Sequence, residues 1–258
     1  MGDFQFISTS VQNRIGMVEL NRPKQYNSLN RQMVREIVEA FEEFEHDENV
    51  RVIVISGKGK AFSSGADIDE MASDDSIRLE LLNQFADWDR LSLMKKPIIG
   101  ALHGFVFGGG FELALSCDVL IAAEGTELCF PEVNLGVMPG AGGTQRLTKL
   151  VGRTKALEWI WSAKRISANE ALQYGVVNKV VQKELLLEET LKFAKMISNK
   201  PPLAIRLIKE SVTKAVDYSL YEGMQYERKN FYLLFSSEDQ KEGMQAFVEK
   251  RNPQFKGR

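Results

Sequence analysis

The stretch Gly108-Gly109-Gly110-Phe111-Glu112 combines residue types that could do chemistry. Consecutive glycines accept backbone angles that other residues resist, and they let a ligand approach the backbone closely. A helix that begins here would have first amides without partners, which can bind an anion. Glu112 would then lie in the first helical turn between apolar neighbours, as a candidate buried acid. The pattern by itself also allows a plain glycine-rich loop with a solvated glutamate.

A second loop of small residues, Ser63-Ser64-Gly65-Ala66-Asp67, follows the apolar, β-branched run 50–55. The run is typical of a buried parallel strand, and the run 98–103 before the triple glycine is also predicted to be a strand. Ligands of α/β sheets gather at the carboxyl ends of strands. Two amides that converge from these loops would form an oxyanion hole. Two unrelated tight turns would give the same pattern.

The elements that must position these loops alternate between strand and helix up to about residue 145. Hydrophobic residues at helical spacing after Asn30 predict a capped helix, and those at 77–91 predict another. This alternation is typical of α/β architecture with crossover connections. The predicted strands are 4–10, 15–20, 50–55, 98–103, 118–123, 128–130 and 176–181.

The last quarter of the chain is predicted to be helical, over 183–198, 201–216, 218–235 and 237–250. Ser237 and Gln240 are spaced as a capping box. These helices carry more apolar and aromatic residues than a solvated tail would tolerate, among them Phe231 and Phe247. We therefore expect them to pack on the core, on another subunit, or on both.

The composition of the chain limits the classes of function that it can have. The chain has 258 residues, 44% hydrophobic and 26% charged, with a net charge of −2, so no general attraction to nucleic acid or anionic membranes is expected. Cys117 and Cys129 lack metal-ligand spacing and are expected to be reduced and buried. Only His46 and His103 are present, too few for a histidine-based zinc site. No signal peptide or membrane span is evident, so a cytoplasmic location is expected.

Several segments together make the chain resemble the crotonase (enoyl-CoA hydratase/isomerase) superfamily, and within it the enoyl-CoA hydratases. The similar segments extend over nearly the whole chain in the family's order. They are 20–24 (LNRPK), 60–68 (KAFSSGADI), 103–113 (HGFVFGGGFEL), 130–132 (FPE), 139–147 (PGAGGTQRL), 166–168 (ISA) and 242–251 (EGMQAFVEKR).

The resemblance implies hydration of a trans-2-enoyl-CoA thioester, in fatty-acid β-oxidation or related acyl-CoA breakdown. By family position, the amides of Ala66 and Gly109 form the oxyanion hole, which suits the charge of a growing enolate. Glu112 is predicted to be the base that activates water, and Glu132 the acid that protonates Cα. Gly140 matches a position that holds the water. The division of roles between the two coupled carboxylates is left open.

Coenzyme A contacts are also implied by the resemblance. Lys24 and Lys60 match family positions near the nucleotide, and Lys250 would reach it from a neighbouring subunit. Each lysine could equally be a solvated surface charge. Coenzyme A is part of the substrate, so no cofactor and no metal are expected. The remaining residues assigned to substrate binding are Ser64, Asp67 and Ile68.

The implied fold is α/β, a crotonase-like spiral of repeated ββα units with a helical C-terminal trimerisation region. We expect residues 1–195 to form the spiral core with the acyl-CoA site, and residues 196–258 to mediate a homotrimer or a hexamer built as a dimer of trimers. The sequence leaves open which acyl chain is preferred, which pathway the protein serves and whether it forms a trimer or a hexamer.

Three alternatives remain. A Δ3,Δ2-enoyl-CoA isomerase needs one acid–base group, which the presence of two glutamates disfavours. A hydratase of branched or dicarboxylic substrates, such as methylglutaconyl-CoA, is compatible with the motifs. A non-catalytic RNA-binding protein of the same fold is disfavoured by the acidic balance and the lack of a basic aromatic face.

Overall fold

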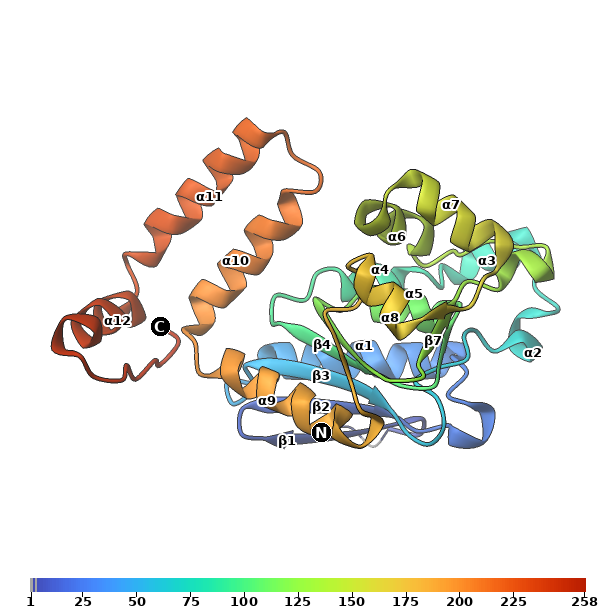
Figure 1. The fold of residues 1–258 in the computed structure, drawn as a ribbon, viewed down its shortest axis with the longest axis horizontal. Helices are drawn as coiled ribbons and strands as arrows, with labels where there is room; N and C mark the ends of the chain where they lie inside the picture. Colours follow the sequence, from blue (N-terminus) through green and yellow to red (C-terminus); the bar gives the residue numbers. More distant parts are fainter. Residues whose placement is uncertain (1, 3) are drawn as a thin grey trace.

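A six-stranded sheet is the base of the molecule in the computed structural model, which describes residue 2 and residues 4–258 (Figure 1). Its order is β1-β2-β3-β4-β6-β9, antiparallel between β1 and β2 and parallel elsewhere. The strands are β1 (Ile7–Gln12), β2 (Ile15–Leu20), β3 (Val52–Gly57), β4 (Ile98–Leu102), β6 (Val119–Ala123) and β9 (Lys179–Val181).

Strand β3 shows why this sheet is covered on both faces. Its residues alternate between two hydrophobic clusters, because successive side chains of a strand point to opposite faces. Ile53 and Ile55 pack in the cluster that contains helix α1 (Arg31–His46). Val52 and Val54 pack in the cluster that contains α9 (Leu186–Ser198). A parallel strand buried on both faces accounts for the run at 50–55, which is apolar except for Arg51.

Helix α1 starts where the sequence predicts. The side chain of Asn30 accepts a hydrogen bond from the Met33 amide at 2.8 Å, which satisfies one of the unpaired donors of the first turn. The helix buries one apolar face, which includes Ile37 and Phe41, against the sheet. The predicted cap and helix are therefore confirmed.

A smaller sheet, in the order β5-β7-β8, lies beside the first. Its strands are β5 (Phe105–Phe107), β7 (Glu127–Cys129) and β8 (Ile166–Ser167). Twice the chain runs from the large sheet to the small one and then into a helix. It does so as β4, β5 and α5 (Gly109–Leu115), and again as β6, β7 and α6 (Gly143–Val151), with the 3-10 turn η2 (Glu132–Leu135) between β7 and α6. After β3 the same path is shortened to a single bridge between Ser63 and Val106. This arrangement agrees with the predicted spiral of ββα units.

Two details of the sequence prediction are corrected. The helix predicted over 77–91 is two helices, α3 (Ser76–Leu82) and α4 (Ala86–Leu91), because Asn83 adopts a left-handed conformation that ends the first. The triple glycine does not follow the strand 98–103 directly. Strand β5 intervenes, and the glycines thus lie at the end of the small sheet.

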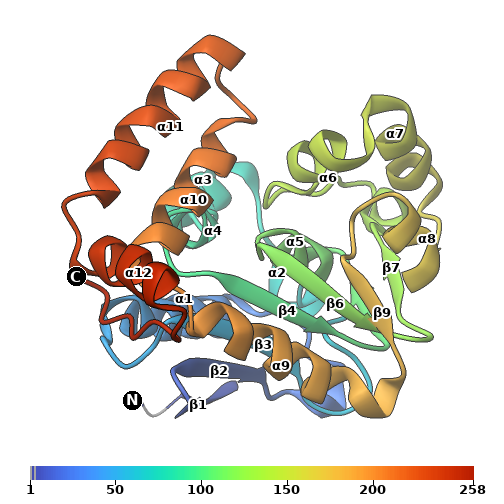
Figure 2. The same cartoon turned by 60° about the vertical axis from the view of Figure 1, so that its left-hand side comes forward.

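The C-terminal helices α10 (Pro202–Lys214), α11 (Leu220–Leu234) and α12 (Glu238–Glu249) extend away from the sheets as an arm (Figures 1 and 2). No residue of α10 or α11 is buried within the chain. Ser237 accepts the Gln240 amide, but the reciprocal half of the predicted capping box is not formed there. A complete capping box instead joins Ser219 and Glu222 at the start of α11.

The predicted boundary at 195/196 falls inside α9, which continues to Ser198 and packs Ala194 against the sheet. The remaining elements are η1 (Pro23–Gln25), α2 (Ile68–Met71), α7 (Arg153–Ser162), α8 (Ala168–Gln173) and η3 (Lys183–Leu185). Across the described residues, no helix has the length and apolarity that crossing a bilayer requires.

Candidate active site

The start of α5 is built by the triple glycine. Gly108 has φ +50°, and its amide donates to the Cys129 carbonyl at 2.9 Å, which ties the turn to β7. Its own carbonyl accepts the amides of Phe111 and Glu112 at 2.8 and 3.0 Å, which closes the first helical turn. The amide of Gly109 is left without an acceptor among the described residues. The helix therefore presents a free donor at its positive end.

Ala66 supplies a second free amide beside the first. The chain on either side of it is fixed on Leu29, which donates to the Gly65 carbonyl at 2.7 Å and accepts the Asp67 amide at 3.0 Å. The Ala66 amide itself has no acceptor within the part of the chain that the structure describes. The point where a side chain would begin on Gly109 lies 3.6 Å from the Ala66 nitrogen. The two amides assigned to the oxyanion hole are thus brought together.

Glu112 lies in the first turn of α5 and is only 4% exposed. Its Oε1 atom accepts the backbone amides of Ala141 at 2.7 Å and Gly143 at 2.8 Å. Burial raises the pKa of Glu112, and the hydrogen bonds from Gly143 and Ala141 oppose that rise because they stabilise the ionised form. Gly143 must be glycine here, since a Cβ would come within 2.9 Å of Oε1 and 2.8 Å of the Phe130 ring.

Glu132 begins the turn η2 and is less deeply buried than Glu112. Its Oε1 atom lies 3.0 Å from the position that a Gly108 side chain would occupy, so this carboxyl lies against the triple glycine. Its Oε2 atom is buried and has no hydrogen-bond partner among the described residues. Burial, with a smaller contribution from the nearby Glu112 charge, raises the pKa of Glu132 to about 7. A carboxyl with this pKa is half protonated at neutral pH.

The amides that hold Glu112 were not assigned from the sequence. Ala141 and Gly143 belong to the segment 139–147 that carried the resemblance, but only Gly140 was given a role. Gly140 itself is exposed and lies against Phe85, whose ring a Cβ would approach to 2.8 Å. Its predicted role in holding a water stays a prediction. The glycines of this segment could have pointed to the amides of Ala141 and Gly143, because glycine lets another group approach the backbone closely.

The predicted coenzyme A lysines are exposed. Lys24 lies in η1, and Lys60 lies in the loop after β3. The two loops pack closely together. A Cβ atom added to Gly59 would lie only 2.9 Å from Pro23. The buried Asn27 side chain donates from Nδ2 to the carbonyls of Lys58 at 3.0 Å and Ala61 at 2.8 Å. Both lysines therefore lie on one joined surface.

Lys250 is the left-handed residue that ends α12, and it is exposed. In both overall views α12 lies at the left edge of the molecule, well separated from α5 (Figures 1 and 2). The prediction that this lysine acts on a neighbouring subunit's substrate is not tested by one chain.

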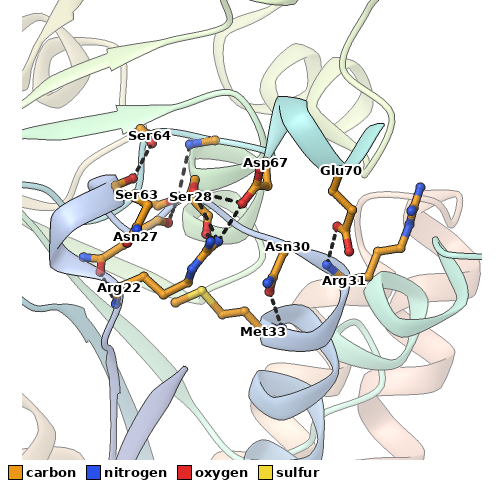
Figure 3. A network of polar contacts seen from close by, with 12 residues as sticks. Arg22, Asn27, Ser28, Asn30, Arg31, Met33, Ser63, Ser64, Asp67 and Glu70 are labelled. Atoms are coloured by element: carbon orange, nitrogen blue, oxygen red, sulfur yellow. Dashed lines mark hydrogen bonds and ion pairs between the residues drawn. The ribbon is translucent and has the colours of Figure 1, made fainter. Parts of the chain in front are cut away.

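The remaining residues predicted to contact the substrate lie in different environments. Ser64 is half-buried and donates to the Gln25 carbonyl at 3.3 Å, and Ile68 is exposed. The carboxylate of Asp67 is engaged by the Arg22 guanidinium at 2.9 Å (Figure 3). A direct contact between Asp67 and substrate thus stays a prediction, and its observed partner is a protein cation.

A cavity of about 480 Å³ adjoins the segment that holds Glu112, with Gly142, Asp118, Arg146 and Asp217 in its lining. Neither glutamate lines it. No group of three or more histidine, cysteine or acidic side chains suited to a metal ion occurs among residue 2 and residues 4–258. The two carboxyls and the two free amides together can support proton transfer at a substrate whose oxygen the amides bind.

The comparison with known proteins defines the class. A family model described as enoyl-CoA hydratase/isomerase matches residues 10–258, and the chain belongs to this family. The predicted crotonase resemblance is thereby confirmed.

Particular relatives are similar over nearly the full length. The chain is 43% identical over 247 residues to the mitochondrial enoyl-CoA hydratase of Pongo abelii, covering 95% of this chain and 84% of the relative. It is 39% identical over 249 residues to the 2,3-dehydroadipyl-CoA hydratase of Escherichia coli (strain K12), covering 96% and 98%. The crystal structure of enoyl-CoA hydrates subunit I from Geobacillus kaustophilus HTA426 superposes with a TM-score of 0.98 at 63% identity, over 100% of both chains. The α/β crotonase fold is confirmed by this match.

Proposed function

We propose that the protein adds water across the double bond of a trans-2-enoyl-CoA thioester and forms the 3-hydroxyacyl-CoA. The observation that carries the proposal is the placement of two carboxyls in unlike environments beside two free backbone amides. Membership in the enoyl-CoA hydratase/isomerase family and the hydratase relatives support the same reaction.

The amides of Ala66 and Gly109 receive the thioester carbonyl oxygen. When water attacks Cβ, negative charge moves to that oxygen as an enolate forms. Fixed donors stabilise this charge without reorganising, and the α5 dipole adds to the effect at Gly109. This step needs no cofactor, because coenzyme A is part of the substrate.

Glu112 is the base and Glu132 is the acid in this mechanism. Glu112 accepts one proton from the attacking water, and the hydroxyl adds to Cβ. Glu132 gives its proton to Cα as the enolate collapses to the thioester. The assignment follows the surroundings: backbone amides favour the ionised form of Glu112, while the unpartnered Oε2 and the raised pKa favour protonated Glu132. Proton exchange with solvent then restores both groups.

The surface that carries Lys24 and Lys60 receives the coenzyme A phosphates. Its cations provide the local positive charge that the acidic chain as a whole lacks. The acyl group extends from the glutamates toward apolar side chains, of which Phe85 touches Gly140. Similarity to the 2,3-dehydroadipyl-CoA hydratase keeps dicarboxylic enoyl-CoA thioesters among the candidate substrates.

The arm provides the assembly interface in this proposal. Its helices expose large apolar side chains, with Phe231 55% and Phe247 85% exposed in the single chain. Exposed patches of this kind mark association surfaces. We propose a homotrimer, or a dimer of trimers, in which Lys250 approaches the substrate of a neighbour. A cytoplasmic location and the lack of nucleic-acid or membrane partners stay predictions.

The test is direct. Loss of the conjugated thioester absorbance is followed with crotonyl-CoA, longer-chain, branched and dicarboxylic 2-enoyl-CoA thioesters, and the thioesters are ranked by kcat/KM. The product is identified as the 3-hydroxyacyl-CoA by mass. A 3-enoyl-CoA is assayed in parallel. Isomerisation much faster than hydration would replace this proposal by the isomerase alternative, and the absence of both reactions would overturn it.

A further inference from the structure

Arg22 and Asp67 form an ion pair (Figure 3), and Asp67 directly follows Ala66 in the chain. We propose that they are positioning residues for the oxyanion hole, and that Arg22 also neutralises a carboxylate that would otherwise oppose negative charge on the thioester oxygen. The inference rests on the proposed function, because it assigns a role in the same site.

The first step of the argument is mechanical. Ala66 is held by backbone contacts of its neighbours to Leu29, and the Asp67 side chain adds a further anchor on the same segment. Asp67 Oδ2 accepts Arg22 Nη1 at 2.9 Å and lies 3.5 Å from the Ser28 hydroxyl. The peptide that carries the Ala66 amide is therefore fixed by the backbone and by a side chain immediately after it. A donor fixed in this way keeps its direction when charge develops on its acceptor.

The second step concerns Arg22 itself. Its Nη1 also donates to the Ser28 carbonyl at 2.7 Å and lies 3.2 Å from the Ser28 hydroxyl, and the guanidinium carbon lies 5.2 Å from the centre of the Phe6 ring. Its backbone amide donates to Asn27 Oδ1 at 2.9 Å. The guanidinium is thus held by an aromatic face and by three oxygen atoms around Nη1.

The third step is electrostatic. The side chains of Arg22 and Asp67 are 15% and 18% exposed, so water screens their charges only in part. Asp67 adjoins in sequence the residue that must donate to an oxyanion. Its charge alone would destabilise that oxyanion, because like charges repel in a weakly screened site. With Arg22 in place, the pair is neutral overall and its contribution to the local field is small.

The two roles predict different kinetics for the single and double variants. Arg22→Gln leaves the negative charge of Asp67 uncompensated. We expect kcat to fall about ten- to hundredfold, a loss no greater than that caused by removing one oxyanion donor. Asp67→Asn removes the opposing charge and keeps much of the shape, and we expect a fall of about threefold or less. The double variant Arg22→Gln/Asp67→Asn should recover several-fold over Arg22→Gln alone. If the pair were purely structural, the three variants would differ in thermal stability but not in kcat measured on folded protein.

Two further variants control for stability. Arg22→Lys keeps the charge, so its kcat should exceed that of Arg22→Gln even if both unfold at the same temperature. Arg206→Gln breaks another ion pair of the same 2.9 Å length, to Glu45, outside this site. It should lower thermal stability without changing kcat for hydration. A matching loss of kcat in Arg206→Gln would overturn the assignment, because the effect would then follow stability alone.

The closing experiment reads the oxyanion hole without turnover. The probe is 4-(dimethylamino)cinnamoyl-CoA, a conjugated thioester whose absorption moves to longer wavelength when its carbonyl oxygen accepts stronger hydrogen bonds. Bound to wild type it should show such a shift, bound to Arg22→Gln a smaller one, and bound to the double variant an intermediate one. Equal shifts in all three proteins would overturn the positioning role. A wild type that shifts the probe but hydrates no enoyl-CoA would overturn the proposed function and leave this assignment standing.

Discussion

The two turns that carry Glu112 and Glu132 place the same type of side chain in different environments. At the start of α5, Glu112 is buried and receives two backbone amides. At η2, Glu132 lies on a turn followed by exposed residues, and one of its buried oxygens has no partner among the described residues. Burial raises the pKa of both carboxyls. At Glu112 the amides of Gly143 and Ala141 oppose the rise, whereas at Glu132 only the backbone of its own turn does so, and the nearby Glu112 charge adds to the rise.

This difference explains how two glutamates can have two roles at one pH. Amide donors favour a carboxylate, and an unpaired oxygen in a poorly hydrated place favours the neutral acid. In the proposed mechanism, the backbone around each glutamate thus sets its role.

The largest effect is expected from removing either proton-exchanging group. Glu112→Gln and Glu132→Gln should each lower kcat for hydration by about 10²–10⁴, the usual range for a positioned acid or base. KM should change little, since the amide donors remain. The double variant should lose much less than the product of the single losses, because both groups serve one reaction. Steady-state kinetics with crotonyl-CoA provide the measurement.

The matched control is Glu36→Gln, which changes a buried glutamate that accepts the Phe6 amide at 2.8 Å far along the chain from the site. It should reduce stability and leave kcat nearly unchanged. Near-wild-type hydration by Glu112→Gln would remove Glu112 from the mechanism.

The next effect concerns the backbone around Glu112. Gly143→Ala should lower kcat by about ten- to hundredfold, because its Cβ would displace the carboxylate and the Phe130 ring. Gly223→Ala is the control: it lies within α11, nothing lies within 4 Å of its Cβ position, and a small gain in helix stability is expected. The measurement is kcat together with thermal unfolding of both variants. Wild-type kcat in Gly143→Ala would show that the base tolerates displacement.

The pH dependence tests the environment of Glu132. Because the acid must be protonated, kcat/KM should fall as pH rises through about 7, approaching tenfold per pH unit above it. Glu132→Gln should lose this alkaline limb from its residual activity. A pH–rate profile from pH 5 to 9 measures both. An unchanged alkaline limb in Glu132→Gln would assign that pKa to another group, or to the coupled pair.

The smallest expected effect is on stability. A carboxyl whose pKa is raised on folding contributes stability below its unfolded pKa, and this contribution is lost as pH rises through about 7. The glutamine of Glu132→Gln does not titrate. The melting temperature of this variant, relative to that of wild type, should therefore rise by about a few degrees between pH 5 and pH 8.

The control for this experiment is Glu242→Gln. Hydrogen bonds from Arg251 and the Gln254 amide lower the pKa of Glu242 to about 2, so it stays ionised across the same range. Its effect on the melting temperature should be the same at pH 5 and pH 8. A constant difference for Glu132→Gln as well would contradict the raised pKa.

Local patterns predicted most of the elements. The helix after Asn30 and the strand at β3 were confirmed because a capping residue and a two-sided apolar run are local signals. The short strand β5 and the break at Asn83 were missed. Three residues are too few to show a period, and the preference of an asparagine for a left-handed turn inside an apolar helical pattern is weak.

The family, the residue types of the site and their order along the chain can be read from the sequence. Motifs such as the triple glycine are readable because backbone freedom is a property of the residue itself. Only the tertiary structure decided that the amides of Ala141 and Gly143 hold Glu112, that an oxygen of Glu132 is left unpaired, and that Asp67 has Arg22 as its partner. These are contacts between segments far apart in the chain. Their hydrogen bonds and burial, which set the charge of each carboxyl, exist only once the sheets and α5 have brought those segments together.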